Sequence, residues 1–174
     1  MDTRRSTGVG LCFKAKKKLP IYRFLSSTNV FYLLDPLNNL KKSQDRLKPL
    51  LSEFSGVSGR FPSPEELKRA RKMQTLLYFG HGNGYKYIKD CRNRILALFG
   101  CSSAKMLYYS NFRRQGAINS YLRHCSFLIG CLWDITDKDL DSLTKVILEE
   151  GEIERSACKL KYLNGAAVVV YGNR

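Results

Sequence analysis

The sequence predicts an α/β fold in which a mostly parallel β-sheet is flanked by helices. Two observations lead to this prediction: the five-residue apolar runs 75–79 and 95–99 both end in glycine, and helical segments alternate with such runs. Apolar runs of this kind are typical of strands buried on both faces of a parallel sheet. With 174 residues, 44% of them hydrophobic, the chain is long enough for one domain with its own core.

The predicted strands are short, apolar and bounded by turn residues. They cover residues 29–34, 75–79, 95–99, 126–132 and 166–171. The first strand ends at Asp35-Pro36, a dipeptide typical of turns. The second and third strands run directly into Gly80 and Gly100, which predicts tight turns at those ends.

The predicted helices alternate with these strands. They cover about residues 39–54, 63–73, 114–124 and 136–150. Residues 63–66 (Ser-Pro-Glu-Glu) combine a capping Ser, Pro at the first helical position and acids in the first turn. Thr136 and Asp139 predict a capping box for the last helix. Pro49 is expected to break or kink the first helix, and residues 56–59 are expected to form a loop.

The chain begins with a basic segment. Residues 1–24 contain seven Lys or Arg residues, and we expect a weakly structured arm there, with disorder as an open alternative. The segment lacks the apolar stretch and cleavage site of a secretory signal. No apolar run elsewhere approaches the roughly 20 residues that a spanning helix needs. We therefore expect an intracellular protein without a membrane partner, whose domain covers residues 25–174.

Charge and cysteine content limit the possible partners. The 30 Lys and Arg residues against 15 Asp and Glu residues give a net charge of +15, which favours anionic partners such as nucleic acid. No zinc-finger spacing or aromatic RNA-binding motif accompanies this charge, so we expect non-specific DNA contact. The six cysteines include no CxxC pair, and we expect neither a metal nor another cofactor. Cys125, Cys131 and Cys158 are expected to lie in the core.

Two predicted strands end next to a reactive side chain. His81 follows residues 75–79, and Cys101 follows residues 95–99, 20 residues further along the chain. This interval has room for a crossover connection, so the strands can be parallel neighbours whose ends meet at one edge of the sheet. A thiolate beside an imidazole can attack a carbonyl carbon. From spacing alone, a buried core thiol and a turn histidine stay open as the alternative.

The glycines around the histidine suit the same chemistry. Gly80 and Gly82 flank His81 and carry no Cβ, so the backbone can approach a substrate closely. We expect the amides of Gly82 and Cys101 to donate hydrogen bonds to a developing oxyanion.

Three motifs resemble those of separase, the caspase-related cysteine protease of anaphase. The histidine motif at residues 78–84 reads Tyr-Phe-Gly-His-Gly-Asn-Gly, and the nucleophile motif at residues 99–103 reads Phe-Gly-Cys-Ser-Ser. The block at residues 132–141, Leu-Trp-Asp-Ile-Thr-Asp-Lys-Asp-Leu-Asp, is similar to the block that follows in that family. Residues 32–36 (Tyr-Leu-Leu-Asp-Pro) fit upstream, so the resemblance covers about residues 29–172.

The resemblance implies a caspase-like fold and a cysteine endopeptidase that cuts after arginine. Its substrate would be the kleisin subunit of cohesin, whose cleavage allows sister chromatids to separate at anaphase. Cys101 carries over as the nucleophile and His81 as the general base and acid. A securin-type inhibitor, a place in the cytoplasm and nucleus, and association with chromatin or the spindle during mitosis are implied in the same way.

Acidic residues after the strand at 126–132 also predict an arginine pocket. Asp134 follows that strand, where its carboxylate can hold a guanidinium through two hydrogen bonds. Asp137 is a second candidate, although an acid in the first turn of a helix also complements the helix dipole. Trp133 can either wall this pocket or lie in the core, and Asp141 is expected to face solvent.

Two other functions stay open. The net charge of +15 fits a non-catalytic, chromatin-associated binding module on the same fold. An arginine-specific caspase-like protease with another substrate would carry the same residues. Labelling of Cys101 by an arginine-directed probe, together with cleavage of a kleisin, distinguishes the three.

Overall fold

The computed structural model describes residues 27–108, 114–115, 117–150 and 162–172. The basic arm expected at residues 1–24 lies outside the described residues, as does Cys158. Within the described ranges, no helix has both the length and the apolar character that crossing a bilayer requires.

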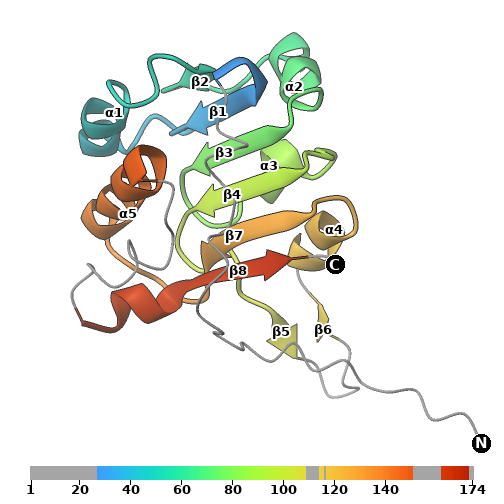
Figure 1. The fold of residues 1–174 in the computed structure, drawn as a ribbon, viewed down its shortest axis with the longest axis vertical. Coiled ribbons are helices and arrows are strands. Elements are labelled where there is room, and N and C mark those ends of the chain that lie inside the picture. The colour runs from blue at the N-terminus through green and yellow to red at the C-terminus, as the bar shows by residue number, and fades with distance from the viewer. Residues whose placement is uncertain (1–26, 109–113, 116, 151–161, 173–174) are drawn as a thin grey trace, which may run out of the picture.

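The core of the molecule is a six-stranded sheet with the order β2-β1-β3-β4-β7-β8 (Figure 1). Its strands are β1 Val30–Leu34, β2 Ser55–Ser58, β3 Thr75–Phe79, β4 Ile95–Phe99, β7 Phe127–Cys131 and β8 Val168–Gly172. The strand β8 is antiparallel to β7, and the other neighbours are parallel. The predicted mostly parallel sheet is therefore confirmed, with one antiparallel strand at an edge.

All five predicted strands are present within two residues of their expected ends. The prediction of a loop at residues 56–59 is wrong, because the strand β2 occupies Ser55–Ser58 at the other edge of the sheet. The segment reads Ser-Gly-Val-Ser, and Val57 is its one fully buried side chain. An edge strand with so little apolar surface has no hydrophobic pattern by which the sequence could indicate it.

Helices cover both faces of the sheet. They are α1 Lys41–Leu47, α2 Pro64–Ala70, α3 Tyr85–Ile88, α4 Ala117–Leu122 and α5 Asp137–Glu150. On one face, Leu47 of α1 and Leu143 of α5 pack in one cluster with Phe79 of β3. On the other face, Ile88 of α3 and Tyr121 of α4 pack with residues of the central strands. Figure 1 shows α1 and α5 side by side near the carboxyl ends of β1, β3 and β4.

The helix termini follow the capping signals in the sequence. The Ser63 hydroxyl accepts a hydrogen bond from the Glu66 amide at 3.2 Å, and the Glu66 carboxylate accepts one from the Ser63 amide at 2.7 Å. Thr136 accepts from the Asp139 amide at 3.2 Å in the same way. The first helix is shorter than expected and ends at Leu47, because Pro49 has no N–H to continue it.

The remaining elements are small. β5 Leu107–Tyr108 and β6 Arg114–Gln115 form a separate antiparallel pair, and two 3₁₀ segments, η2 Ser27–Asn29 and η3 Tyr162–Ala167, precede β1 and β8. The thiols of Cys125 and Cys131 are buried in the core as expected.

Candidate functional site

The strands β3 and β4 end side by side at one edge of the sheet. They are parallel neighbours, and their last residues, Phe79 and Phe99, lie directly opposite each other. The two rings stack with centroids 5.0 Å apart and planes 6° apart. His81 and Cys101 each follow two residues after these phenylalanines, so they leave the sheet at the same level.

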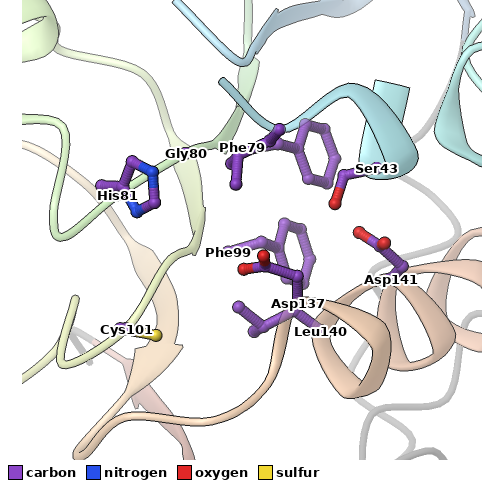
Figure 2. Close-up of a pocket in the computed structure, with 10 residues that line it drawn as sticks. Ser43, Phe79, Gly80, His81, Phe99, Cys101, Asp137, Leu140 and Asp141 are labelled. Carbon is purple, nitrogen blue, oxygen red and sulfur yellow. The ribbon is translucent and has the colours of Figure 1, made fainter. Parts of the chain in front are cut away.

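A pocket lies at this edge, between the strand ends and the helices α1 and α5 (Figure 2). It is lined by Leu40, Ser43, Phe79, Gly80, His81, Phe99, Cys101, Asp137, Leu140 and Asp141. Figure 2 shows His81 and Cys101 at one end of this pocket, with Ser43 and Asp141 at the other. The structure therefore brings the two predicted catalytic residues to one cavity.

Residues 100–104, which we call the nucleophile loop, are fastened to β7 and the segment after it. The Ala104 amide donates to the carbonyl of Cys131 at 2.8 Å, and the Ser102 amide donates to the carbonyl of Trp133 at 3.2 Å. Ser102 has a φ of 52°, an uncommon conformation for a residue with a side chain. The loop is thus held in a strained turn by bonds from its own backbone.

The thiol of Cys101 is half-buried and is engaged by a backbone group. Its Sγ–H donates to the carbonyl of Ile135 at 3.1 Å. Burial raises the pKa of Cys101, and the nearby carboxylates of Asp134 and Asp137 raise it further. The raised pKa favours the protonated thiol, which is the form that can donate to the Ile135 carbonyl.

Residues 80–84, which we call the histidine loop, carry an exposed His81. Its Nε2 lies 3.2 Å from Asn39 Oδ1, and its carbonyl accepts a hydrogen bond from the Tyr78 hydroxyl at 3.0 Å. Gly82 and Gly84 both have positive φ values, 63° and 65°, which glycine adopts without strain. The amides of Gly82 and Cys101 stay predictions as oxyanion donors.

The two loops touch through their backbones at Gly100. A Cβ at this position would lie 2.1 Å from the carbonyl oxygen of Gly82 and 2.4 Å from that of Gly80. Such distances are far below van der Waals contact, so only glycine fits. The sequence analysis missed this requirement, although the glycine directly before the cysteine is the signal that could have revealed it.

The acidic residues divide between the pocket and its surroundings. Asp137 lines the pocket with His81 and Cys101, whereas Asp134 and Trp133 are not among the lining residues. The Asp134 carboxylate instead accepts a hydrogen bond from the Ser102 hydroxyl at 2.6 Å. Trp133 is 39% exposed, so the alternative that it lies in the core is wrong.

Asp141 is a pocket residue that the sequence analysis placed wrongly in solvent. Its side chain is 7% exposed, and one carboxylate oxygen accepts from Arg46 Nε at 2.7 Å and from Arg46 Nη2 at 2.5 Å. Burial raises the pKa of Asp141, and the bonds from Arg46 and Ser43 oppose this rise. Asp141 stands four residues after Asp137 on α5, so helical spacing already puts the two carboxylates on one face.

The arrangement combines the groups that acyl transfer requires. A thiol and an imidazole line one end of a pocket, and two carboxylates are among its other lining groups. Within the described ranges, no three His, Cys, Asp or Glu side chains gather closely enough to hold a metal ion. The chemistry that these residues support is nucleophilic attack by sulfur with proton transfer by imidazole.

The chain is similar to known proteins in both sequence and structure. The profile of the separin protease domain matches residues 11–140. The chain is 33% identical over 169 residues to separin of Mus musculus, covering 83% of this chain and 8% of that protein. It is 35% identical over 179 residues to separin of Emericella nidulans, covering 83% of this chain and 9% of that protein.

The fold is similar to that of separase in the crystal structure of the Saccharomyces cerevisiae separase–securin complex. The TM-score is 0.70 at 31% sequence identity, over 83% of this chain and 12% of the separase chain. The chain thus spans between 8% and 12% of the length of these relatives. The caspase-like α/β fold that the motifs imply is confirmed, and this chain belongs to the family of separin protease domains.

Proposed function

We propose that this chain is a separase-type cysteine endopeptidase domain with Cys101 as nucleophile and His81 as general base and acid. The observation that carries the proposal is that both side chains follow neighbouring parallel strands and line the same pocket. Ligands of parallel sheets bind at this carboxyl edge. Family membership adds support, because the relatives are separins.

The chemistry begins when the thiol of Cys101 turns from the Ile135 carbonyl toward His81. The imidazole takes the thiol proton, and the sulfur attacks the scissile carbonyl carbon to form a thioester as the peptide bond breaks. The imidazolium returns its proton to the leaving amine, and water then hydrolyses the thioester. The amides of Gly82 and Cys101 are the proposed donors to the oxyanion.

Cleavage after arginine is supported by the carboxylates that line the pocket. Asp137 and Asp141 both face it, and Asp141 already binds the guanidinium of Arg46. A carboxylate in a half-enclosed site discriminates strongly for a guanidinium over a neutral side chain. The pocket lining favours Asp137 and Asp141 over Asp134 and Trp133, whose part in substrate binding stays a prediction.

The proposed substrate is the kleisin subunit of cohesin, and the proposed role is the separation of sister chromatids at anaphase. The solved relative is a complex of separase with securin, which supports a securin-type inhibitor as a partner. We extend the proposal to the cytoplasm and nucleus, with association with chromatin or the spindle during mitosis.

Weak DNA contact is supported at the amino ends of the parallel strands, which lie opposite the pocket. The turns that lead into β3, β4 and β7 expose basic side chains. These are Arg71, Lys72, Arg92, Arg94 and Arg123. Contact of this kind depends on phosphate charge, so it is expected to weaken steeply as salt concentration rises.

The decisive experiment measures cleavage of a kleisin and of an arginine peptide. Cys101→Ser and His81→Ala are each expected to lower kcat by at least about a thousandfold. His124→Ala is the matched control, because His124 is exposed in the turn after α4 and lies outside the pocket. Unchanged cleavage by Cys101→Ser would exclude this cysteine as the nucleophile.

A second experiment tests the arginine pocket with a pair of peptides that carry arginine or the neutral isostere citrulline. Asp137→Ala is expected to lower kcat/KM for the arginine peptide about tenfold more than for the citrulline peptide, a difference of about 1.4 kcal/mol. Asp134→Ala is expected to affect both peptides equally. A larger loss of arginine selectivity in Asp134→Ala than in Asp137→Ala would instead identify Asp134 as the residue that binds the arginine.

The second candidate function is a non-catalytic binding module on the same fold. The observation that favours it is the hydrogen bond from Cys101 Sγ to the Ile135 carbonyl at 3.1 Å, which turns the thiol to a backbone group instead of to His81. Such a module would bind DNA in a salt-sensitive manner and leave Cys101 unlabelled by a thiol-reactive arginine peptide. Arginine-peptide cleavage without kleisin cleavage would instead indicate a protease with another substrate.

A further inference from the structure

We propose that Asn39 is a third member of the site, a positioning residue that fixes the tautomer and orientation of His81. The inference rests on the proposed roles of Cys101 and His81 and extends them to the loop between β1 and α1. It is drawn from the hydrogen bond between the His81 ring and Asn39 and from the bonds that hold that loop in place.

The contact itself determines which ring nitrogen carries the proton. Asn39 Oδ1 lies 3.2 Å from His81 Nε2, and an amide oxygen can only accept a hydrogen bond. Nε2 must therefore carry the proton, and Nδ1 keeps its lone pair. The thiol proton of Cys101 can then move to Nδ1, which yields a thiolate and an imidazolium whose Nε2–H stays bonded to Asn39.

Asn39 is held by a buried carboxylate rather than by solvent-exposed contacts. The Asp35 carboxylate, which is 1% exposed, accepts hydrogen bonds from the backbone N–H of Asn39 at 3.0 Å and from that of Leu40 at 2.8 Å. It also accepts one from the side-chain Nε2 of Gln44 at 2.6 Å. Burial acts to raise the pKa of Asp35, but these bonds outweigh it and lower the pKa. The anchor is thus a buried carboxylate whose oxygens accept hydrogen bonds from the loop and from Gln44 of α1.

The same anchor ties the Asn39 loop to the strand that carries the histidine. The Asp35 amide donates to the carbonyl of Phe79, the last residue of β3, at 2.7 Å. Asn39 and His81 therefore extend from two backbone segments that are bonded to each other at their base. A short path of this kind fixes the distance between the two side chains.

The neighbouring asparagine has a different task, which makes it a control. Asn38 has a φ of 58°, and its Oδ1 accepts from Gln44 Nε2 at 3.1 Å and from Lys41. Its side chain thus stabilises the loop from within, whereas Asn39 contacts the imidazole. Loss of Asn38 weakens the loop, and loss of Asn39 removes the hydrogen-bond acceptor.

The test compares Asn39→Ala, Asn39→Asp and Asn38→Gly in the full chain. The tautomer of His81 is determined from ¹⁵N–¹H correlations of the imidazole nitrogens, and kcat and KM are measured with an arginine peptide. Asn39→Ala is expected to give mixed tautomers and to lower kcat about 10- to 100-fold, with little change in KM. Asn39→Asp retains an oxygen acceptor, so it should keep the Nε2–H tautomer and most of the activity.

Two results would overturn the proposal. One is an unchanged tautomer and an unchanged kcat in Asn39→Ala. The other is an Asn38→Gly variant that alters the tautomer as much as Asn39→Ala does, since loop stability alone would then account for the effect. Because the tautomer is read without turnover, an inactive wild-type chain would refute the proposed protease while leaving the Asn39 contact separately tested.

Discussion

The two loops at the pocket edge are supported differently. The nucleophile loop bonds through its backbone to β7 and to the segment after it, and its Ser103 side chain is buried. The histidine loop has a backbone bond from the Gly80 amide to the Phe99 carbonyl at 3.3 Å, and two hydroxyls support it further: those of Tyr78 and Tyr121 donate to the carbonyls of His81 and Asn83. His81 itself stays exposed.

This difference teaches where the site tolerates change. Backbone bonds cannot be removed by a side-chain substitution, whereas bonds from side chains can be removed one at a time. The nucleophile loop should therefore fail through packing and buried polar groups. The histidine loop should respond in smaller steps, because the hydroxyls of Tyr78 and Tyr121 can each be removed without the other.

The largest effect is expected at Gly100, where the two loops meet. Gly100→Ala would place a Cβ 2.1 Å from the Gly82 carbonyl oxygen, so backbone on both loops must move. We expect the free energy of unfolding, measured by urea denaturation, to fall by about 3 kcal/mol or more. Arginine-peptide cleavage is expected to fall by about 100-fold or more, since Cys101 and His81, the proposed catalytic pair, both shift.

Gly82→Ala is the matched control for this substitution. A Cβ there meets nothing within 4 Å, although the φ of 63° is unfavourable for alanine. The expected cost is about 1–2 kcal/mol, from backbone strain alone. Equal losses in the free energy of unfolding for Gly82→Ala and Gly100→Ala would mean that the close approach of the two loops does not require glycine at position 100.

Ser103→Ala is expected to have the next largest effect. The buried Ser103 hydroxyl donates to the Leu98 carbonyl at 2.8 Å and accepts from the Cys131 amide at 3.0 Å. Removing it leaves buried polar groups without these partners, and we expect a loss of about 2–3 kcal/mol in the free energy of unfolding. Denaturant unfolding of the two proteins measures this, and a loss below about 0.5 kcal/mol would show that the network is dispensable.

The fold could be predicted wherever burial leaves a pattern in the sequence. The strands β3 and β4 are apolar at every position because both of their faces are covered. β2 and α3 could not be predicted, since β2 has one fully buried side chain and α3 is a single turn begun by Gly84. Such elements are specified by their neighbours rather than by their own residues.

The site divides in the same way. Cys101 and His81 could be placed because parallel pairing brings strand ends to one level, which requires no knowledge of side-chain contacts. The roles of the acidic residues could not be placed, because they depend on how α1 packs against α5. Arg46 of α1 covers Asp141, and the loop before α1 brings Asn39 to His81.

A smaller effect is expected in the pH dependence of Cys101 alkylation, which tests whether the thiol of the nucleophile loop is ionised by the histidine loop at rest. Burial raises the pKa of the Cys101 thiol, so the thiol is expected to ionise at a higher pH than an ordinary cysteine does. Alkylation of Cys101 by iodoacetamide, followed by mass spectrometry, should therefore accelerate about tenfold per pH unit through the range in which an ordinary cysteine ionises. A rate that is already at its maximum at neutral pH would indicate a thiolate–imidazolium pair at rest.

His81→Ala is the control for that titration. In this structure Cys101 Sγ donates to the Ile135 carbonyl, so removing the imidazole should leave the alkylation profile in place. Peptide cleavage by the same variant should nevertheless be lost. That combination would show that the histidine acts on the thiol only once a substrate turns it away from Ile135.

The smallest effect is expected from Tyr78→Phe on the histidine loop. The Tyr78 hydroxyl donates to the partly buried carbonyl of His81 at 3.0 Å, while its ring packs beneath Gly80 and Gly84 and is retained by phenylalanine. We expect a loss of about 1 kcal/mol in the free energy of unfolding, the net value of one neutral hydrogen bond.

Tyr121→Phe removes the equivalent bond to Asn83 and should cost a similar amount. Because the two hydroxyls hold carbonyls of the same loop, their effects on kcat should be non-additive, while either one should be additive with Ser103→Ala. Non-additivity between Tyr78→Phe and Ser103→Ala would instead mean that the two loops form one cooperative unit, joined at Gly100.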